Sequence, residues 1–231
     1  MAPKDAYDFY LSYAKEANGP ILEPMCGTGR FLLPLLAEGF NIEGFDASES
    51  MLKALATKAK AQNLKPTVWQ DFLESAKPSK KYNLIFIPTG SFGLITDLQA
   101  IKTSLQIIYH LLDKKGVFIF EVESLHSLPK ELGVWRGSRW HTADNKVILL
   151  SQLALLEDTI CYSIGKYELI DSNQVIQAEI EEYKIRLYND TSFLLKLLSE
   201  VGFKEVKLLK AFSRTAPPEE GDETILFECR K

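Results

Sequence analysis

The sequence predicts an α/β fold built on a doubly wound parallel sheet, with a smaller antiparallel insertion. Short apolar runs alternate with helical patterns over residues 5–122, as they do in strand–helix units. A glycine turn, Gly27-Thr28-Gly29, joins the first apolar run to the next helical pattern. From Trp135 to Leu187 no helical pattern is clear, and longer strand-like runs are joined by polar turns.

The first half of the chain follows this alternation element by element. Apolar residues at helical spacing predict a first helix over 5–17, which Asn18-Gly19-Pro20 ends. Ser48 is placed to cap a helix that begins at Glu49. The almost wholly apolar run Tyr82–Ile87 predicts a central strand. The predicted strands of this half are 21–23, 41–46, 67–70, 82–87 and 117–122, and the predicted helices between them are 29–38, 49–62 and 97–112.

The second half changes from alternation to consecutive strands. Strand-like runs at 147–150, 160–164 and 183–187 predict an antiparallel insertion of three or four strands within residues 133–188. A helix over 191–201, closed by Gly202, and two antiparallel strands over 205–211 and 224–230 follow it. With 231 residues, we expect one domain, 1–231, in which the insertion covers the active site.

Composition narrows the function. The net charge of −4 and the pI of about 5.5 argue against a nucleic-acid partner, which needs a basic face. No apolar run reaches the ~20 residues of a membrane span, and the N-terminal residues lack the apolar core of a signal peptide, so we expect a cytoplasmic protein without a membrane partner. Cys26, Cys161 and Cys229 are far apart, which argues against a disulfide framework and a metal site.

Three acidic residues stand at the ends of the first three predicted strands: Glu23, Asp46 and Asp71. Parallel strands bring these ends to one edge of the sheet. A carboxylate after the second strand suits a ribose diol, and one after the third could accept from the exocyclic amine of adenine. Phe72 could pack on the purine face. The set therefore favours an adenosine ligand, although Asp46 could also serve as an N-cap and Asp71 as a solvated loop residue.

The glycine turn excludes two common nucleotide sites. A dinucleotide fingerprint needs a small residue where this chain has Leu32, and the Gly-Lys-Ser/Thr of a phosphate loop is absent. Glu23, just before the turn, would repel a pyrophosphate but would suit an ammonium or sulfonium ligand. These features point to S-adenosylmethionine.

The chain resembles the class I S-adenosylmethionine-dependent methyltransferases over nearly its whole length. The motifs that carry the resemblance are Glu23–Gly29, Gly44–Ser48 with Met51-Leu52, Gln70-Asp71-Phe72, Leu111–Val117 and Leu197–Phe203. The resemblance implies a Rossmann-like, doubly wound sheet of seven strands in the order 3-2-1-4-5-7-6, with strand seven antiparallel. One position departs from the family, because Met25 replaces the first glycine of the signature and its β-carbon must be accommodated.

The resemblance also implies the cofactor contacts. The backbone of Met25, Cys26 and Gly27 would line the methionine part of the cofactor, while Asp46 would hold the ribose. Pro88 would sit under the sulfonium, and a tyrosine of the first helix would close over the cofactor, with Tyr7, Tyr10 and Tyr13 as candidates. The expected cofactor-binding residues are Tyr10, Glu23, Met25, Cys26, Gly27, Arg30, Asp46, Ala47, Met51, Gln70, Asp71, Phe72 and Pro88.

The methyl acceptor is less well defined by the sequence. The fourth strand ends in Ile87-Pro88-Thr89-Gly90-Ser91, and not in the Asn/Asp-Pro-Pro-Tyr of methyltransferases that act on the amino groups of nucleic acids and glutamine. We therefore expect a small-molecule N or O nucleophile. A protein or RNA acceptor and a regulatory protein that binds the cofactor without catalysis remain alternatives. We expect a monomer or a homodimer.

Candidate substrate residues are His126, Trp135, Arg186 and Tyr188, which lie after the fifth strand, in the insertion or just beyond it. Each has an ordinary structural alternative. His126 could be a surface histidine, Trp135 could pack the insertion, and Arg186 could pair with Glu181 or Glu182. Glu121, Glu123 and His126 could each act as a general base, and the sequence singles out none of them, so the catalytic residue is left unassigned.

Overall fold

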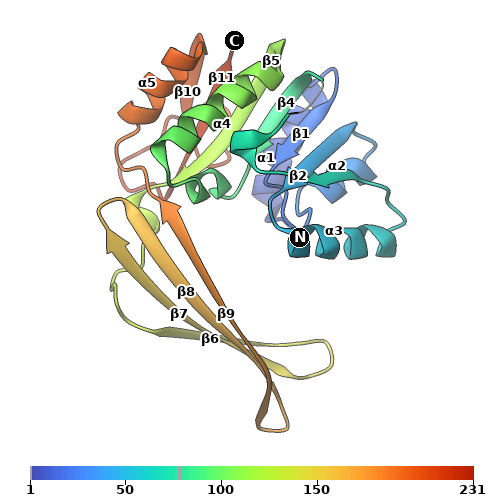
Figure 1. The fold of residues 1–231 in the computed structure, drawn as a ribbon, viewed down its shortest axis with the longest axis vertical. Helices are drawn as coiled ribbons and strands as arrows, with labels where there is room; N and C mark the ends of the chain where they lie inside the picture. Colours follow the sequence, from blue (N-terminus) through green and yellow to red (C-terminus); the bar gives the residue numbers. More distant parts are fainter. Residues whose placement is uncertain (1, 78–79) are drawn as a thin grey trace.

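The computed structural model describes residues 2–77 and 80–231 and consists of an α/β body with a projecting four-stranded arm (Figure 1). The seven-stranded sheet of the body has the order β10-β11-β5-β4-β1-β2-β3. Strands β1 to β5 pair in parallel, whereas β11 is antiparallel to both β5 and β10. This is the predicted order, with β10 and β11 as strands six and seven, so the predicted fold class is confirmed.

The elements of the body agree closely with the sequence patterns. The helices are α1 (Lys4–Glu16), α2 (Leu32–Ala37), α3 (Glu49–Ala61), α4 (Leu98–Leu111) and α5 (Ser192–Val201). The strands are β1 (Ile21–Pro24), β2 (Ile42–Asp46), β3 (Thr67–Gln70), β4 (Tyr82–Ile87), β5 (Leu112–Glu123), β10 (Glu205–Lys210) and β11 (Thr224–Arg230). Short 3₁₀ turns follow three of these strands: η1 (Leu73–Ser75), η2 (Ser91–Leu94) and η3 (Leu125–Ser127).

Helices cover both faces of the sheet. On one face, α4 and α5 bury Leu105 and Leu198 against Phe118 and Phe120. On the other face, α1, α2 and α3 pack on a second cluster that contains Phe86. Both faces of the central strands are therefore buried, which explains why β4 is a continuous apolar run.

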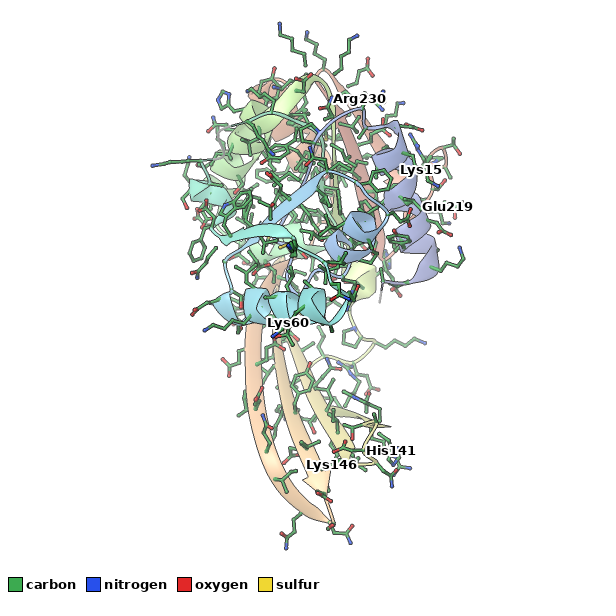
Figure 2. The ribbon with its side chains drawn as sticks, turned by 90° about the vertical axis from the view of Figure 1, so that its right-hand side faces the viewer. Lys15, Lys60, His141, Lys146, Glu219 and Arg230 are labelled. Carbon is green, nitrogen blue, oxygen red and sulfur yellow. The ribbon has the colours of Figure 1, made fainter. Side chains whose placement is uncertain are left out.

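The arm comprises β6 (Arg136–His141), β7 (Val147–Glu157), β8 (Ile160–Asp171) and β9 (Gln174–Arg186), in antiparallel sequence order. Figure 1 shows these strands leaving the body together and extending well beyond it. In Figure 2, His141 and Lys146 lie near the far end of the arm, below Lys60 at the edge of the body. Most residues of β9 are exposed, because the outer part of this sheet has no layer packed on it.

In the body, two predicted boundaries differ from the structure by more than one residue. Helix α2 begins at Leu32 and not at Gly29, because the chain makes a series of turns over residues 25–31. Strand β5 begins at Leu112 and not at Val117, because the polar segment 113–116 continues the strand through a register shift opposite Tyr82 and Leu84. No helix among the described residues is both long and apolar enough to cross a membrane.

Candidate cofactor and acceptor site

The loop between β1 and α2 forms a cradle at the carboxyl edge of the sheet. Met25, Gly27 and Gly29 all adopt positive φ angles, of 57°, 51° and 76°. A β-carbon at Gly29 would come within 2.9 Å of the Leu33 side chain, so both conformation and space require glycine there. Met25 adopts the same left-handed conformation at a position where the family signature has glycine, at a cost of about 1–2 kcal/mol for an L-residue.

Asp46, the last residue of β2, binds this cradle through hydrogen bonds. One carboxylate oxygen accepts a hydrogen bond from the Gly27 backbone N–H at 2.7 Å, and the other accepts from the Ser48 N–H at 2.8 Å. Ser48 in turn caps α3 by accepting from the Met51 N–H at 3.3 Å. Each carboxylate oxygen has a second lone pair, so Asp46 can still accept from the hydroxyls of a ribose.

A first cavity, of about 600 Å³, lies beyond Asp46 on the α4 side of the cradle. It is mostly apolar, and Asp71 and Phe72 line it, together with Ala47 and Met51. The side chain of Phe72 is 55% exposed and that of Leu94 is 46% exposed, which leaves apolar surface open on two sides of the cavity. The Asp71 carboxylate already accepts from the Phe72 N–H at 2.9 Å and keeps its second oxygen for another donor. This cavity has the size and chemistry to hold adenosine.

A second cavity, of about 350 Å³, adjoins the first, and both are lined by Met25, Gly27, Met51 and Ser91. The second cavity also contacts Glu23, Cys26, Arg30 and Pro88. Glu23 is only 2% exposed, and its Oε2 atom has no hydrogen-bond partner among the described residues. Burial raises the pKa of the Glu23 carboxyl well above its ordinary value, and the nearby Asp46 raises it further. A cationic ligand would relieve both effects, so the donor set fits a sulfonium and ammonium group.

The turn after β4 forms the far wall of this second cavity. Thr89 and Gly90 adopt consecutive positive φ angles of 58° and 66°, which is unusual for a β-branched threonine. The Thr89 N–H donates to the carboxylate of Glu121, which also accepts from the Tyr10 hydroxyl. Glu121 is buried, and this burial raises the pKa of its carboxyl. The buried pair therefore holds a strained turn in place beside the cavity.

Several predicted site residues lie outside these two cavities. Tyr10 is fully buried, with its ring stacked on Phe86, and Tyr7 and Tyr13 donate to Glu38 and Glu228. The Gln70 amide donates to the Ala47 carbonyl at 2.9 Å, so it supports the wall of the first cavity from behind.

The candidate substrate residues are also dispersed. His126 and Trp135 are exposed, and Tyr188 is buried in the core of the body. The Arg186 guanidinium donates to the Thr96 carbonyl at 2.8 Å and to the Thr159 hydroxyl at 2.9 Å, and not to Glu181 or Glu182. Strand alternation explains this difference, because Glu181 points to the opposite face and Glu182 lies four residues, or about 13 Å, away.

A third cavity, of about 340 Å³, lies where the arm meets the body. Glu123 lines it from the end of β5 and Ser127 from the turn η3, while Arg136, Cys161 and Tyr183 line it from three strands of the arm. The sequence indicates Glu123 as one possible base, but nothing in it predicts that Arg136 and Tyr183 lie beside Glu123. It also missed Thr89, Ser91 and Thr96, and the only signal for these was their position just after an apolar central strand.

Among the described residues, no group of three or more His, Cys, Asp and Glu side chains is arranged to hold a metal ion. Comparison with known proteins agrees with the cradle. Residues 21–116 match the family described as a methyltransferase domain.

Similar proteins extend this match over the whole chain. A protein of Geobacillus sp. (strain WCH70) named as a methyltransferase is 24% identical over 246 residues, which cover 100% of this chain and 94% of the relative. Among solved structures, an S-adenosylmethionine-dependent methyltransferase from Clostridium acetobutylicum ATCC 824 is 22% identical with a TM-score of 0.85, covering 100% of this chain and 92% of the other. The sugar N-methyltransferase KedS8 from Streptoalloteichus sp. ATCC 53650 is 17% identical with a TM-score of 0.77, covering 99% and 88%.

The family match begins at β1 and includes the cradle, Asp46 and Asp71. The full-length relative and the shared fold include the arm and the last two strands. Together with a cradle that suits a sulfonium nucleoside, the domain match over residues 21–116 and the similarity over the whole chain support a class I S-adenosylmethionine-dependent methyltransferase.

Proposed function

We propose that this enzyme transfers the methyl group of S-adenosylmethionine to a nitrogen or oxygen of a small molecule that enters from the side of the arm. The observation that carries the proposal is the pair of adjoining cavities on the carboxyl edge of the sheet, which share Met25, Gly27, Met51 and Ser91. Two adjoining cavities of about 600 and 350 Å³ suit a ligand with a nucleoside at one end and an amino acid at the other.

In this proposal the first cavity takes the adenosine and the second takes the methionine. Asp46 accepts from the ribose hydroxyls, while Asp71 and Phe72 contact the adenine. Glu23 faces the cationic end of the ligand from its buried position, and Arg30 lines the same cavity and can pair with the ligand carboxylate. Gln70 and Tyr10 support the site without contacting the ligand. Gln70 holds the Ala47 carbonyl, and Tyr10 holds the turn at Thr89 through Glu121.

The bound cofactor supplies an activated methyl group, so the chain itself has to orient the acceptor and exclude water. We infer that the insertion, residues 133–188, serves as the cover on the acceptor side within a single functional unit. Its support is the cavity at the base of the arm, lined both by the end of β5 and by arm strands. The likeness to KedS8, described as a sugar N-methyltransferase, supports a small acceptor.

Titration calorimetry with S-adenosylmethionine and S-adenosylhomocysteine tests the cofactor part of this proposal. We expect Asp46→Ala to weaken binding of both ligands by about 1–3 kcal/mol, because charge-assisted hydrogen bonds to the ribose are lost. Asp113→Ala, which removes a carboxylate at the start of β5 on the opposite edge of the sheet, should leave both affinities unchanged. Unchanged affinity in Asp46→Ala would remove the ribose role.

Asp46 also bonds the cradle, so a second variant separates the two roles. Asp46→Asn keeps an oxygen that can accept from the Gly27 N–H but loses the negative charge. The amide NH2 then faces the Ser48 N–H, so we expect this variant to lose some stability but less than Asp46→Ala, and yet to discriminate less between adenosine and 2′-deoxyadenosine as competitors. If wild-type protein bound neither S-adenosylmethionine nor its demethylated product below millimolar concentrations, the proposed function would be lost.

A further inference from the structure

The third cavity offers a carboxylate close to the place where a methyl group would be delivered. A β-carbon built on Gly90 would lie 3.0 Å from Oε1 of Glu123, so the Glu123 carboxyl packs directly against the turn after β4. Thr89 and Ser91, the neighbours of Gly90, line the cavity assigned to the methionine part of the cofactor. Glu123 therefore lies one strand away from that cavity, on the side that faces the arm.

Two neighbouring acids, Glu121 and Glu23, lie outside the cavity at the arm. Glu121 is buried beneath Tyr10 and Thr89 and does not line the cavity at the arm. Glu23 lines the methionine cavity on the far side of the turn. Of the candidate bases after β5, His126 is exposed and lies outside the lining of the third cavity. Glu123 is thus the carboxylate that an acceptor in this cavity would meet.

The surroundings of Glu123 leave it able to bind a cation. The Ser127 hydroxyl donates to Oε2 at 3.2 Å, and no ion pair joins Glu123 to a Lys or Arg among the described residues. The cavity also contains Arg136, whose guanidinium donates to the Glu131 carbonyl at 2.7 Å. Cys161 and Tyr183 line the arm side, and Glu223 contributes a negative charge nearby. Burial, reinforced by Glu223, raises the pKa of the Glu123 carboxyl.

We propose that the cavity between β5 and the base of the arm receives the methyl acceptor as an amine, and that Glu123 binds its ammonium form and takes its proton. This inference rests on the proposed function. The ammonium N–H bond breaks and its proton passes to the carboxylate. The freed lone pair of nitrogen then forms a bond to the methyl carbon, while the carbon–sulfur bond breaks and its electron pair stays on sulfur. The products are a methylated ammonium ion, S-adenosylhomocysteine and a protonated Glu123.

The chemistry of the carboxylate favours an amine over an alcohol. A half-buried carboxylate attracts an ammonium ion strongly, and a carboxyl whose pKa lies above the ordinary range is better matched to remove its proton near neutral pH. The same group is a very weak base for a hydroxyl, whose proton is held far more tightly. The acceptor class follows from the group that is present at the cavity, and the volume of about 340 Å³ limits the acceptor part to a small molecule.

Binding of simple probes tests this assignment without knowledge of the natural acceptor. In full-length protein loaded with S-adenosylhomocysteine, NMR titration with propylammonium chloride and with 1-propanol compares an ammonium with an alcohol of matched size. We expect the wild type to bind the ammonium at least tenfold more tightly, Glu123→Gln to lose this preference, and Glu123→Asp to retain part of it. Equal affinities in the wild type, or an unchanged preference in Glu123→Gln, would overturn the proposal.

Two controls keep the test specific. Glu131→Gln changes an exposed glutamate close to the arm and should preserve the tenfold preference. Calorimetry should give Glu123→Gln the wild-type affinity for S-adenosylhomocysteine, which shows that the fold and the cofactor site are intact. The ammonium titration is repeated on protein without cofactor, so that a failure to bind S-adenosylhomocysteine, which would sink the proposed function, is distinguished from a failure of Glu123 to bind ammonium.

Turnover gives an independent readout. With S-adenosylmethionine and a panel of primary and secondary amines paired with alcohols of equal size, mass spectrometry should detect methylation of amines by the wild type. We expect Glu123→Gln to methylate the same amines at least tenfold more slowly at neutral pH, with the deficit shrinking as rising pH deprotonates the amine in solution. Methylation of the alcohols and not of the amines would overturn the proposal.

Discussion

The α/β body and the arm differ in how far their sheets are buried. In the body, five helices cover both faces of the sheet, and Phe86 and Phe120 are completely buried. In the arm, strands carry apolar side chains that remain in water, such as Ile180 of β9 at 68% exposure. The body is therefore stabilised by packing, whereas the arm is stabilised by strand pairing and by its attachment at the base.

The two regions also contribute differently to the candidate sites. The cofactor cradle consists of tight loops fixed by the buried body, in which even strained residues such as Thr89 are held by hydrogen bonds. The third cavity combines one rigid wall from β5 with a wall of arm strands. In the proposed function, the body would fix the cofactor and the base Glu123, and the arm strands would supply the remaining contacts to the acceptor.

Truncating one apolar residue in each region should reveal the largest difference in stability between the body and the arm. We expect Phe86→Ala to lower the free energy of unfolding by about 3–5 kcal/mol, because it opens a cavity between α1 and the sheet. Ile180→Ala should change it by no more than about 0.5 kcal/mol. Chemical denaturation followed by circular dichroism measures both, and a loss above 2 kcal/mol in Ile180→Ala would show that the arm carries a packed core of its own.

A smaller effect is expected from removing a hydroxyl in each region. Tyr10→Phe leaves the buried Glu121 with one donor fewer, which should cost about 1–3 kcal/mol of unfolding free energy. Tyr162→Phe removes a hydroxyl from β8 in the arm and should cost about 0.5 kcal/mol or less. The midpoints of urea denaturation compare the two variants, and equal losses would mean that the buried pair does not stabilise the body.

The smallest effect concerns the strain at Met25. At an ordinary position glycine is less stable than alanine, but at a φ of 57° the β-carbon of alanine is itself strained. We therefore expect Met25→Gly to be about 1 kcal/mol more stable than Met25→Ala, although both lose the same apolar side chain. Thermal unfolding of the two variants measures the difference directly. A more stable Met25→Ala would mean that the cradle adopts another conformation.

The sequence is more informative about the body than about the arm. The bounds of β3 and β4 are those predicted, and α3 begins at Glu49 after its Ser48 cap. These elements are marked by buried apolar runs, caps and glycines, which are local signals. Helix α2 begins later than predicted, because turns with positive φ look like the first turn of a helix when only the residue types are known.

In the arm the local signals are weaker. Strand β6 contains Arg, Gly, Ser, Trp and His residues and has no apolar run, so the sequence allows for a fourth arm strand but does not give its bounds. The other arm strands extend well beyond their apolar runs, because a sheet with both faces in water has no buried side to set the alternation. The same reasoning applies to the sites: Asp46 and Asp71 follow strands in sequence, whereas the grouping of Glu123, Arg136 and Tyr183 depends on a pairing register that the residues do not specify.

The point at which the arm joins the body has a consequence for how the chain folds. The arm separates β5 from its partner β11, but the Tyr188 N–H donates to the Glu123 carbonyl at 2.7 Å, so the arm leaves and rejoins the body at almost the same place. The arm strands are joined by short loops, so neighbouring strands can pair without closing a long loop. Once they have paired, the two ends of the long segment between β5 and α5 lie close together. The arm thereby brings residues 189–231, about a fifth of the chain, back to β5, the strand with which β11 pairs.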